Sequence, residues 1–189
     1  MSSSLGSIFR IHTFGESHGP AVGVVIDGCP PRLPITSEEI QSDLDRRRPG
    51  QSSLVTQRDE KDAVEVLSGW KNGLTLGTPL ALLVRNQDHI SGAYDHLKDV
   101  YRPSHADFTT DQKYGIRAHE GGGRSSARET IGRVAAGAVA RKLLSISAGV
   151  QVLAWVHQIH NISGSYEINN VTLDDVESSP TRCPDPGAA

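Results

Sequence analysis

A glycine-rich segment that leads into a long amphipathic helix constrains the fold more than any other feature of the chain. Residues 121–130 read GGGRSSARET, and apolar residues then recur at three- and four-residue steps from Ile131 to Leu143. This spacing predicts a helix with one buried face. Ser126 and Glu129 have the S-x-x-E spacing of a capping box, so we expect the helix to begin near Ser126.

Two arginines at this helix start predict an anion site. Arg124 lies just outside the first turn and Arg128 lies inside it, where the helix dipole disfavours cations. The preceding glycines let backbone N–H groups approach a ligand, and such groups at a helix start suit a phosphate or a carboxylate. A flexible turn before an ordinary surface helix is the alternative. The segment is not a Walker loop, because no Gly-Lys-Ser/Thr follows the glycines.

The composition indicates a globular protein of one domain. The chain has 189 residues, of which 37% are hydrophobic and 22% charged, and this length can bury a sizeable core. The formal net charge of -3 argues against a general nucleic-acid binder. Cys29 and Cys183 show neither metal-ligand spacing nor a framework of disulfide pairs, which fits a reducing compartment. We therefore expect one domain over residues 1–189, without a metal site, ending in a flexible tail at residues 179–189.

The start of the chain predicts no targeting or membrane segment. It has no basic region followed by a long apolar run, and the run at residues 8–14 is too short to span a bilayer. We expect a cytoplasmic protein without membrane contact, with a plastid as the alternative if the source is a plant or an alga.

Local patterns along the rest of the chain predict a mixture of strands and helices. Alternating and apolar runs predict strands at residues 8–14, 21–27, 64–67, 80–84 and 150–162. A second capping box, from Thr36 to Glu39, predicts a helix that ends before Pro49, and a shorter helix is expected over residues 105–114. Residues 86–100 are polar and irregular, which is typical of a surface loop.

Several polar residues at the ends of these elements are candidates for chemistry. His18 lies in the hairpin connector at residues 15–19, where Glu16 could hold its imidazole, although a structural core histidine is the alternative. His105 could act in catalysis or serve as a helix cap or local ion-pair partner. The arginines at residues 46–48 crowd a predicted helix end, where the dipole also favours cations for structural reasons alone. These residues predict a pocket for a polyanion, with histidines available for proton transfer.

Four motifs together resemble the chorismate synthase family. They are GESHG at residues 15–19, RRRPGQS at 46–52, RPSHAD at 102–107 and GGGRSSARETIGRVAAG at 121–137. The resemblance covers essentially the whole chain but only the N-terminal half of a family member, because CPDP at residues 183–186 resembles a motif from the middle of the family.

The resemblance implies a reaction, a fold and partners. Chorismate synthase converts 5-enolpyruvylshikimate 3-phosphate to chorismate by a 1,4-anti elimination of phosphate, and it requires reduced FMN without net redox change. The implied fold is α+β, a β-α-β sandwich with helices between antiparallel sheets, here incomplete. The implied partners are a small-molecule substrate and further copies of the chain in a homotetramer, with NADPH as a possible source of reducing equivalents.

Site residues follow from the resemblance position by position. His18 would be the general acid towards the reduced flavin, and His105 would protonate or orient groups near the departing phosphate. The resemblance further assigns flavin contacts to Arg124, Ser125, Ser126 and Ala127, a nicotinamide or phosphate contact to Arg47, and substrate anions to Arg48 and Arg128. Many relatives carry a basic residue where Ser53 stands here, which weakens the NADPH assignment.

Two other functional classes stay open. Because the resemblance places the catalytic base in the half of the family that this sequence does not cover, the chain could be a truncated, non-catalytic fragment that binds phosphate or flavin or acts in assembly. A nucleic-acid binder that uses the arginines at residues 46–48 is disfavoured by the acidic balance and by the lack of basic residues interleaved with aromatic ones.

Overall fold

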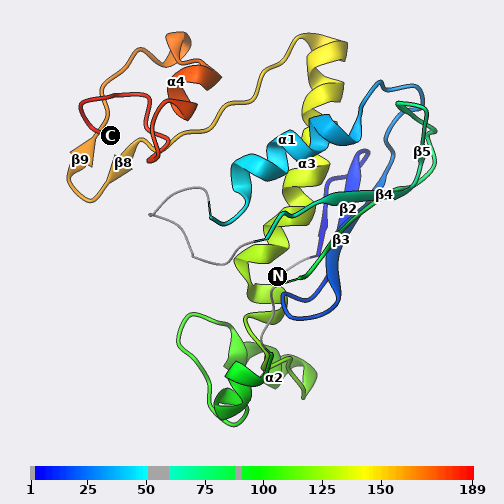
Figure 1. Ribbon diagram of the computed structural model, residues 1–189, viewed down its shortest axis with the longest axis vertical. Coiled ribbons are helices and arrows are strands. Elements are labelled where there is room, and N and C mark those ends of the chain that lie inside the picture. Colours follow the sequence, from blue (N-terminus) through cyan, green and yellow to red (C-terminus); the bar gives the residue numbers. More distant parts are fainter. Residues whose placement is uncertain (1–2, 51–59, 88–90) are drawn as a thin grey trace.

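The computed structural model describes residues 3–50, 60–87 and 91–189, and for residues 91–93 it describes the backbone alone (Figure 1). The end of the arginine motif, Gln51 and Ser52, lies outside the described residues, and so does Ser53. The expectation about NADPH that rests on Ser53 therefore stays a prediction.

One antiparallel sheet of five strands forms the centre of the fold. Its strand order is β1 (Ser4–Leu5), β2 (Arg10–Gly15), β3 (Ala21–Asp27), β7 (Leu80–Arg85) and β4 (Val64–Ser68). Strands β2 and β3 pair with Gly15 opposite Val22, which confirms residues 15–19 as the connector of a hairpin. The strands predicted at residues 64–67 and 80–84 are also confirmed, as neighbours in the sheet.

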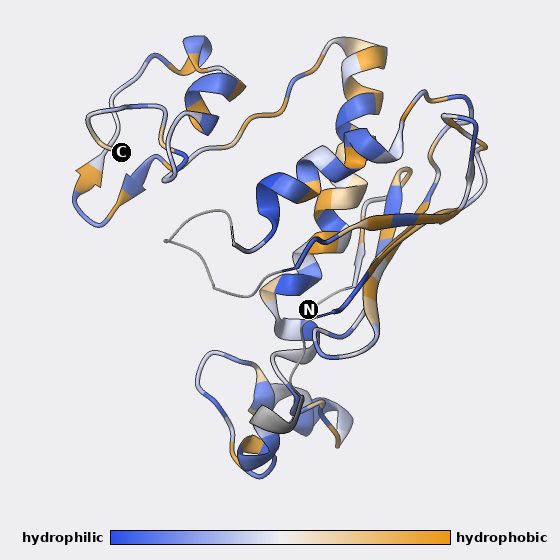
Figure 2. Cartoon of the chain, in the orientation of Figure 1, coloured by the Kyte–Doolittle hydropathy of each residue, from blue (hydrophilic) through white to orange (hydrophobic). Residues whose placement is uncertain are grey.

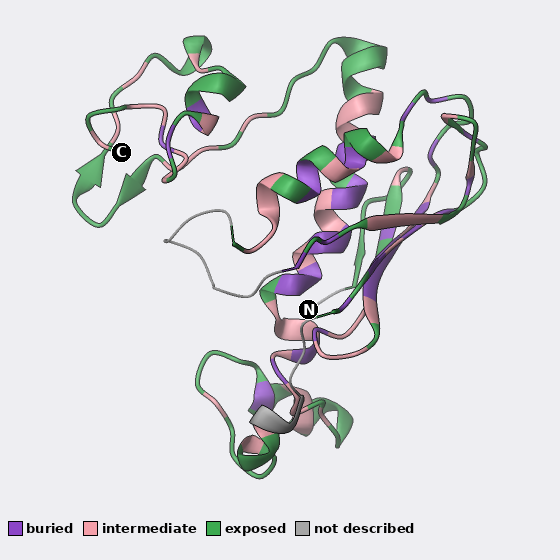
Figure 3. Ribbon diagram, in the orientation of Figure 1, coloured by how far each residue is buried: buried purple, intermediate pink, exposed green. Residues whose placement is uncertain are grey.

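Two helices cover one face of this sheet, α1 (Ser37–Arg47) and α3 (Thr130–Ala148) (Figure 1). Alternate residues of β3 and β7 point towards them and are buried, namely Val22, Val24, Ile26, Leu80, Leu82 and Val84. Gly132 of α3 lies so close to β3 that a Cβ there would be 2.8 Å from the carbonyl oxygen of Gly23. The buried residues in Figure 3 accordingly gather where α1 and α3 meet the sheet.

The two predicted capping boxes have different outcomes. At α1 the Thr36 hydroxyl accepts from the Glu39 amide and the Glu39 carboxylate accepts from the Thr36 amide, so the prediction is confirmed. At α3 it is wrong, because Ser126 precedes a 3-10 turn, Ala127–Glu129, and its hydroxyl accepts from the Arg128 amide. The α-helix therefore begins at Thr130, and Glu129 uses its carboxylate elsewhere.

The segment between β7 and α3 carries short helices. These are η1 (Ser91–Leu97), α2 (Asp107–Tyr114), η2 (Gly123–Ser125) and the 3-10 turn described above, η3 (Ala127–Glu129). The helix predicted over residues 105–114 is confirmed with a later start, whereas η1 interrupts the region that we expected to be an irregular loop. A small hairpin of β5 (Trp70–Lys71) and β6 (Leu74–Thr75) lies between β4 and β7 in the chain.

The strand predicted over residues 150–162 is wrong for most of its length. Within that range only β8 (Gln158–Ile159) and the first residue of its partner strand β9 (Ile162–Ser163) are strand. Residues 150–156 are extended and apolar, as the orange segment after α3 shows in Figure 2, but no described strand pairs with them. Apolar alternation makes a segment suitable for a sheet, yet a strand forms only where a partner supplies the hydrogen bonds.

The chain after residue 156 forms a lobe away from the sheet (Figure 1). It contains the β8–β9 hairpin, η4 (Ile168–Asn170) and α4 (Leu173–Glu177). Within residues 179–189, the Asp185 carboxylate accepts from the Ser165 amide and Cys183 is buried. The flexibility expected for this tail, and the single domain over residues 1–189, stay predictions.

The α+β class with antiparallel sheets is confirmed, and the fold is consistent with an incomplete sandwich. Among the described residues, the sheets are the five-stranded one and two small hairpins, so α1 and α3 have a large sheet on one face only. The described helices include none that is both long enough and apolar enough to cross a membrane.

Candidate functional site

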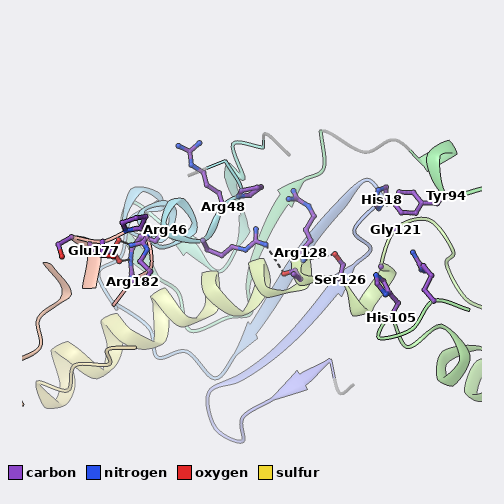
Figure 4. Close-up of a pocket in the computed structure, with 18 residues that line it drawn as sticks. His18, Arg46, Arg48, Tyr94, His105, Gly121, Ser126, Arg128, Glu177 and Arg182 are labelled. Carbon is purple, nitrogen blue, oxygen red and sulfur yellow. Dashed lines mark hydrogen bonds and ion pairs between the residues drawn. The ribbon is translucent and has the colours of Figure 1, made fainter. Parts of the chain in front are cut away.

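A cavity of about 880 Å³ lies between the hairpin connector, the end of α1, the glycine-rich segment and the C-terminal lobe. Seven of the predicted site residues line it: His18, His105, Arg47, Arg48, Ser126, Ala127 and Arg128. The histidines lie at one end near Tyr94 and Gly121, and Arg46, Arg182 and Glu177 lie at the other (Figure 4). The last two predicted residues, Arg124 and Ser125, line an adjoining cavity of about 520 Å³ that also reaches His105.

Arginines are the most frequent charged residues in the lining of the larger cavity. Its lining holds six arginines, Arg46, Arg47, Arg48, Arg102, Arg128 and Arg182, against one carboxylate, that of Glu177. Arg46 and Arg182 both pair with Glu177, so these two charges are partly neutralised by the chain itself. Arg48 is 41% exposed and lies 3.7 Å from Asp45 of its own helix, a distance that gives only a weak ion pair. The lining therefore favours an anion with several charges.

His18 is held from several sides. Its Nδ1 lies 3.2 Å from the Ser17 hydroxyl, and its ring meets the ring of Tyr94 edge-on at 4.9 Å between centroids. Glu16, which the sequence suggested as its holder, turns its Oε2 towards Gly123 instead. Burial raises the pKa of Glu16, and the nearby Arg124 opposes this shift.

His105 lies in a strained stretch of backbone. Its neighbours Ser104 and Ala106 both have positive φ, 65° and 55°, which costs energy in residues other than glycine and is common at functional sites. The His105 Nδ1 lies 2.8 Å from the Pro103 carbonyl oxygen and the side chain is exposed. The N-cap of α2 is Ala106, so the helix-cap explanation for His105 is not supported.

Asp107, two residues after His105, forms a salt bridge with two arginines. Its carboxylate accepts from Nε of Arg102 at 2.8 Å and lies 3.2 Å from Nη1 of Arg117. The hydrogen bonds from Arg102 outweigh the cost of burial and lower the pKa of Asp107 to about 2. This buried pair holds the start of α2 in place below His105.

Arg124 ties the glycine-rich segment to the sheet. Its guanidinium donates to the carbonyl oxygens of Gly15 and Thr13, at 2.8 and 3.0 Å, and pairs with Glu129. Glu129 is 3% exposed, and burial raises its pKa to about 7 against the opposing effect of Arg124. Within the chain, the carboxylate of Glu129, five residues away in sequence, is therefore an anion that Arg124 contacts.

Arg128 likewise has partners within the chain. It is 4% exposed, lies 2.6 Å from Glu60 and 2.9 Å from Asp62, and donates through Nε to Asn86. Arg47 reaches the same group, since its Nη1 lies 2.8 Å from Oδ2 of Asp62. Asp62 therefore pairs with both arginines and Glu60 pairs with Arg128, so long-range contacts supply counter-anions to both.

Five residues that contact the predicted site residues were not predicted from the sequence. They are Ser17, Glu60, Asp62, Asn86 and Glu129, all buried. Glu60 and Asp62 alternate just before a strand, which is a weak signal, and Asn86 directly follows the last residue of β7. Their roles depend on which site residue each one contacts in the fold, and no local sequence pattern indicates that.

Comparisons with known proteins agree with the motifs. The family model described as chorismate synthase matches residues 9–189. Chorismate synthases of Akkermansia muciniphila and Synechococcus elongatus are each 60% identical to the chain over its whole length, which covers 53% and 52% of those relatives. A crystal structure of chorismate synthase superposes with a TM-score of 0.66 at 32% identity, over 96% of this chain and 50% of that one.

The chain thus spans about half the length of the curated relatives that it matches. The family match extends over nearly all of its sequence and includes every predicted site residue. The chain belongs to the chorismate synthase family.

Proposed function

We propose that this chain forms the N-terminal half of a lyase site that eliminates phosphate from 5-enolpyruvylshikimate 3-phosphate to give chorismate, with reduced FMN as cofactor. The observation that supports this most directly is the cavity lined by six arginines and two histidines. A substrate with a phosphate and two carboxylates, together with a flavin phosphate, needs many cations in one place. Elimination also needs groups that can carry protons near neutral pH, and histidine is suited to that.

The described residues fit a ligand of the size and charge of FMN. A cavity of about 880 Å³ lies within the range of sites for small molecules and cofactors. Its wall at Gly121 has no room for a side chain, because a Cβ there would lie 2.1 Å from His18. When bound, reduced FMN would supply reducing equivalents that are recovered within each turnover. Arg47, Ser126 and Ala127 would hold it from the larger cavity, and Arg124 and Ser125 from the adjoining one.

Proton transfer and substrate binding would fall to different residues of this chain. His18, at one end of the cavity, would donate a proton towards the flavin, and its contacts with Ser17 and Tyr94 would orient the ring. His105 would donate a proton or hydrogen bond to the departing phosphate, and its position on exposed, strained backbone leaves it accessible to a ligand. Arg48 would meet substrate anions, whereas Arg128 would act mainly by holding the walls of the site together.

The alternative is a non-catalytic fragment, and one experiment separates the two. Chorismate formation is measured under anaerobic conditions with photoreduced FMN, once with residues 1–189 alone and once with the remaining half of a relative supplied. We expect no turnover from the chain alone and turnover after complementation, because the resemblance places the base outside this sequence. Comparable rates in both would show that the base lies within residues 1–189. No turnover in either would support the non-catalytic fragment.

Partners and location belong to the same proposal. The family resemblance implies that the complemented protein is a homotetramer and that it is located in the cytoplasm. Light scattering and cell fractionation test these two points. NADPH as the reductant is tested by replacing photoreduction with NADPH, with Arg47→Ala as the variant that should lose the effect.

A further inference from the structure

Asn86 lies where three segments of the chain meet, and its side chain contacts both the connector that carries His18 and Arg128 of the candidate site. It follows directly after β7, and only 8% of it is exposed. Its Nδ2 donates to the carbonyl oxygen of Glu16 at 2.9 Å and to that of Gly19 at 2.6 Å. Its backbone amide donates to the carbonyl oxygen of Pro20 at 3.1 Å. The connector that carries His18 is therefore held at both of its ends by one residue.

The side-chain oxygen of Asn86 is also held by a hydrogen bond. The Asn86 Oδ1 accepts from Nε of Arg128, and Arg128 is fixed by Glu60 and Asp62. The amide orientation is determined by these partners, since two carbonyls require the NH₂ group and a guanidinium requires the oxygen. Asn86 thus joins the buried ionic cluster to the hairpin connector.

The hydrogen bonds of Asn86 shape the connector rather than the sheet. Gly19 donates its amide to the Glu16 carbonyl at 3.1 Å, which closes the turn around His18, and Nδ2 of Asn86 binds that same carbonyl oxygen. His18 lies between the two carbonyl groups that Asn86 holds, so a shift of either one moves the imidazole relative to Tyr94.

We propose that Asn86 is a positioning residue that fixes His18 for proton transfer. The geometric part rests on the hydrogen bonds above, and the catalytic part rests on the proposed function. No other standard side chain of this size offers two donors and one acceptor in a plane. Aspartate lacks the donors, and alanine lacks all three groups.

The first test follows the His18 ring by NMR in the 189-residue chain, without any activity. The Cε1–H signal is assigned by its loss in His18→Ala, and the nearby ring of Tyr94 shifts it in the folded protein. In Asn86→Ala we expect this signal to move towards that of an exposed histidine and to broaden. Leu82→Ala is the control, because Leu82 is a buried core residue of β7 outside the connector. It should lower stability and leave the His18 signal in place.

An unchanged His18 signal in folded Asn86→Ala would overturn the proposal. If that variant does not fold, Asn86→Asp is used, which keeps the acceptor for Arg128 and removes both donors. If neither variant folds, hydrogen exchange is measured on the unaltered chain instead. The Nδ2 protons of Asn86 and the amide proton of Gly19 should exchange with solvent through the same opening. Exchange of Gly19 while Nδ2 of Asn86 stays protected would also overturn the proposal.

The second test measures turnover in the complemented enzyme. We expect Asn86→Ala to lower kcat by about a hundredfold, the size of loss that a misplaced catalytic group causes, with KM little changed. Normal turnover in Asn86→Ala, with His18→Ala inactive, would overturn the positioning role alone. Normal turnover in His18→Ala would instead overturn the proposed function at that residue.

Discussion

The backbone of Gly121 lies against the imidazole of His18. A Cβ at position 121 would lie 2.1 Å from Nδ1 and 2.2 Å from Cε1 of that ring, and φ at this glycine is +60°. The position therefore requires glycine for two separate reasons, its backbone conformation and the space that the ring occupies. This contact links the glycine-rich segment to the hairpin connector, which is more than one hundred residues earlier in the chain.

Gly121→Ala should displace the His18 ring and lower turnover of the complemented enzyme by roughly a hundredfold. Gly73→Ala is the matched control, because Gly73 also has a positive φ, +80°, and no atom lies within 4 Å of its Cβ position. Backbone strain alone should cost each variant about 1–2 kcal/mol of stability, and the clash with His18 adds to this only in Gly121→Ala. Turnover and urea unfolding measure the two effects separately. Equal activity in the two variants would mean that the ring can move aside without loss.

Arg128→Ala should destabilise the fold by about 3–5 kcal/mol, because it removes the buried cation that pairs with the carboxylates of Glu60 and Asp62. Arg48→Ala is the comparison, since Arg48 lies in the same cavity but is 41% exposed. It should leave stability within about 0.5 kcal/mol. It should weaken binding of inorganic phosphate by about 1.5–3 kcal/mol. Chemical unfolding and calorimetry give the two values. If Arg128→Ala keeps its stability, the buried cluster contributes less than its geometry indicates.

Stability should fall between about pH 4.5 and 7 because of Glu129. Burial raises the pKa of this carboxyl from 4.5 to about 7 in the fold. The folded state therefore binds its proton more tightly than the unfolded state, and this contribution is complete below pH 4.5 and lost as the pH rises through 7. The expected loss is on the order of 3 kcal/mol. Glu129→Gln should remove this slope in denaturant unfolding, and the exposed Glu167→Gln should keep it.

Asp107 should produce the opposite dependence at acid pH. Its hydrogen bonds with Arg102 lower the pKa from 3.8 to about 2, so its contribution is present above pH 3.8 and is lost as the pH falls through 2. The expected change is about 2 kcal/mol. Denaturant unfolding between pH 5 and 2 should show a smaller acid loss in Asp107→Asn, while the exposed Asp99→Asn behaves like the unaltered chain. The same slope in both variants would assign the acid loss to other groups.

Much of the secondary structure could be predicted from the sequence, because it depends on neighbours within a few residues. The capping box from Thr36 to Glu39 and the strand at residues 21–27 both match the structure. The apolar spacing also predicts the helix through Ile131, with a start near Ser126, but the α-helix begins at Thr130. A capping box requires the Glu129 carboxylate to reach back to the Ser126 amide, whereas in the structure this carboxylate pairs with Arg124.

Other features were decided by the tertiary structure alone. The apolar run at residues 150–156 has a composition typical of a strand but is not one here, since no described strand pairs with it. The sequence by itself placed His18, His105 and the arginines among the candidate residues, because side-chain chemistry and turn positions are local properties. It could not assign Glu60 to Arg128, which are 68 positions apart, or Asn86 to the connector around His18. Those pairings exist only after folding. Burial removes water from charged groups and carbonyls, so each of them is stabilised by the group that the packed chain brings next to it.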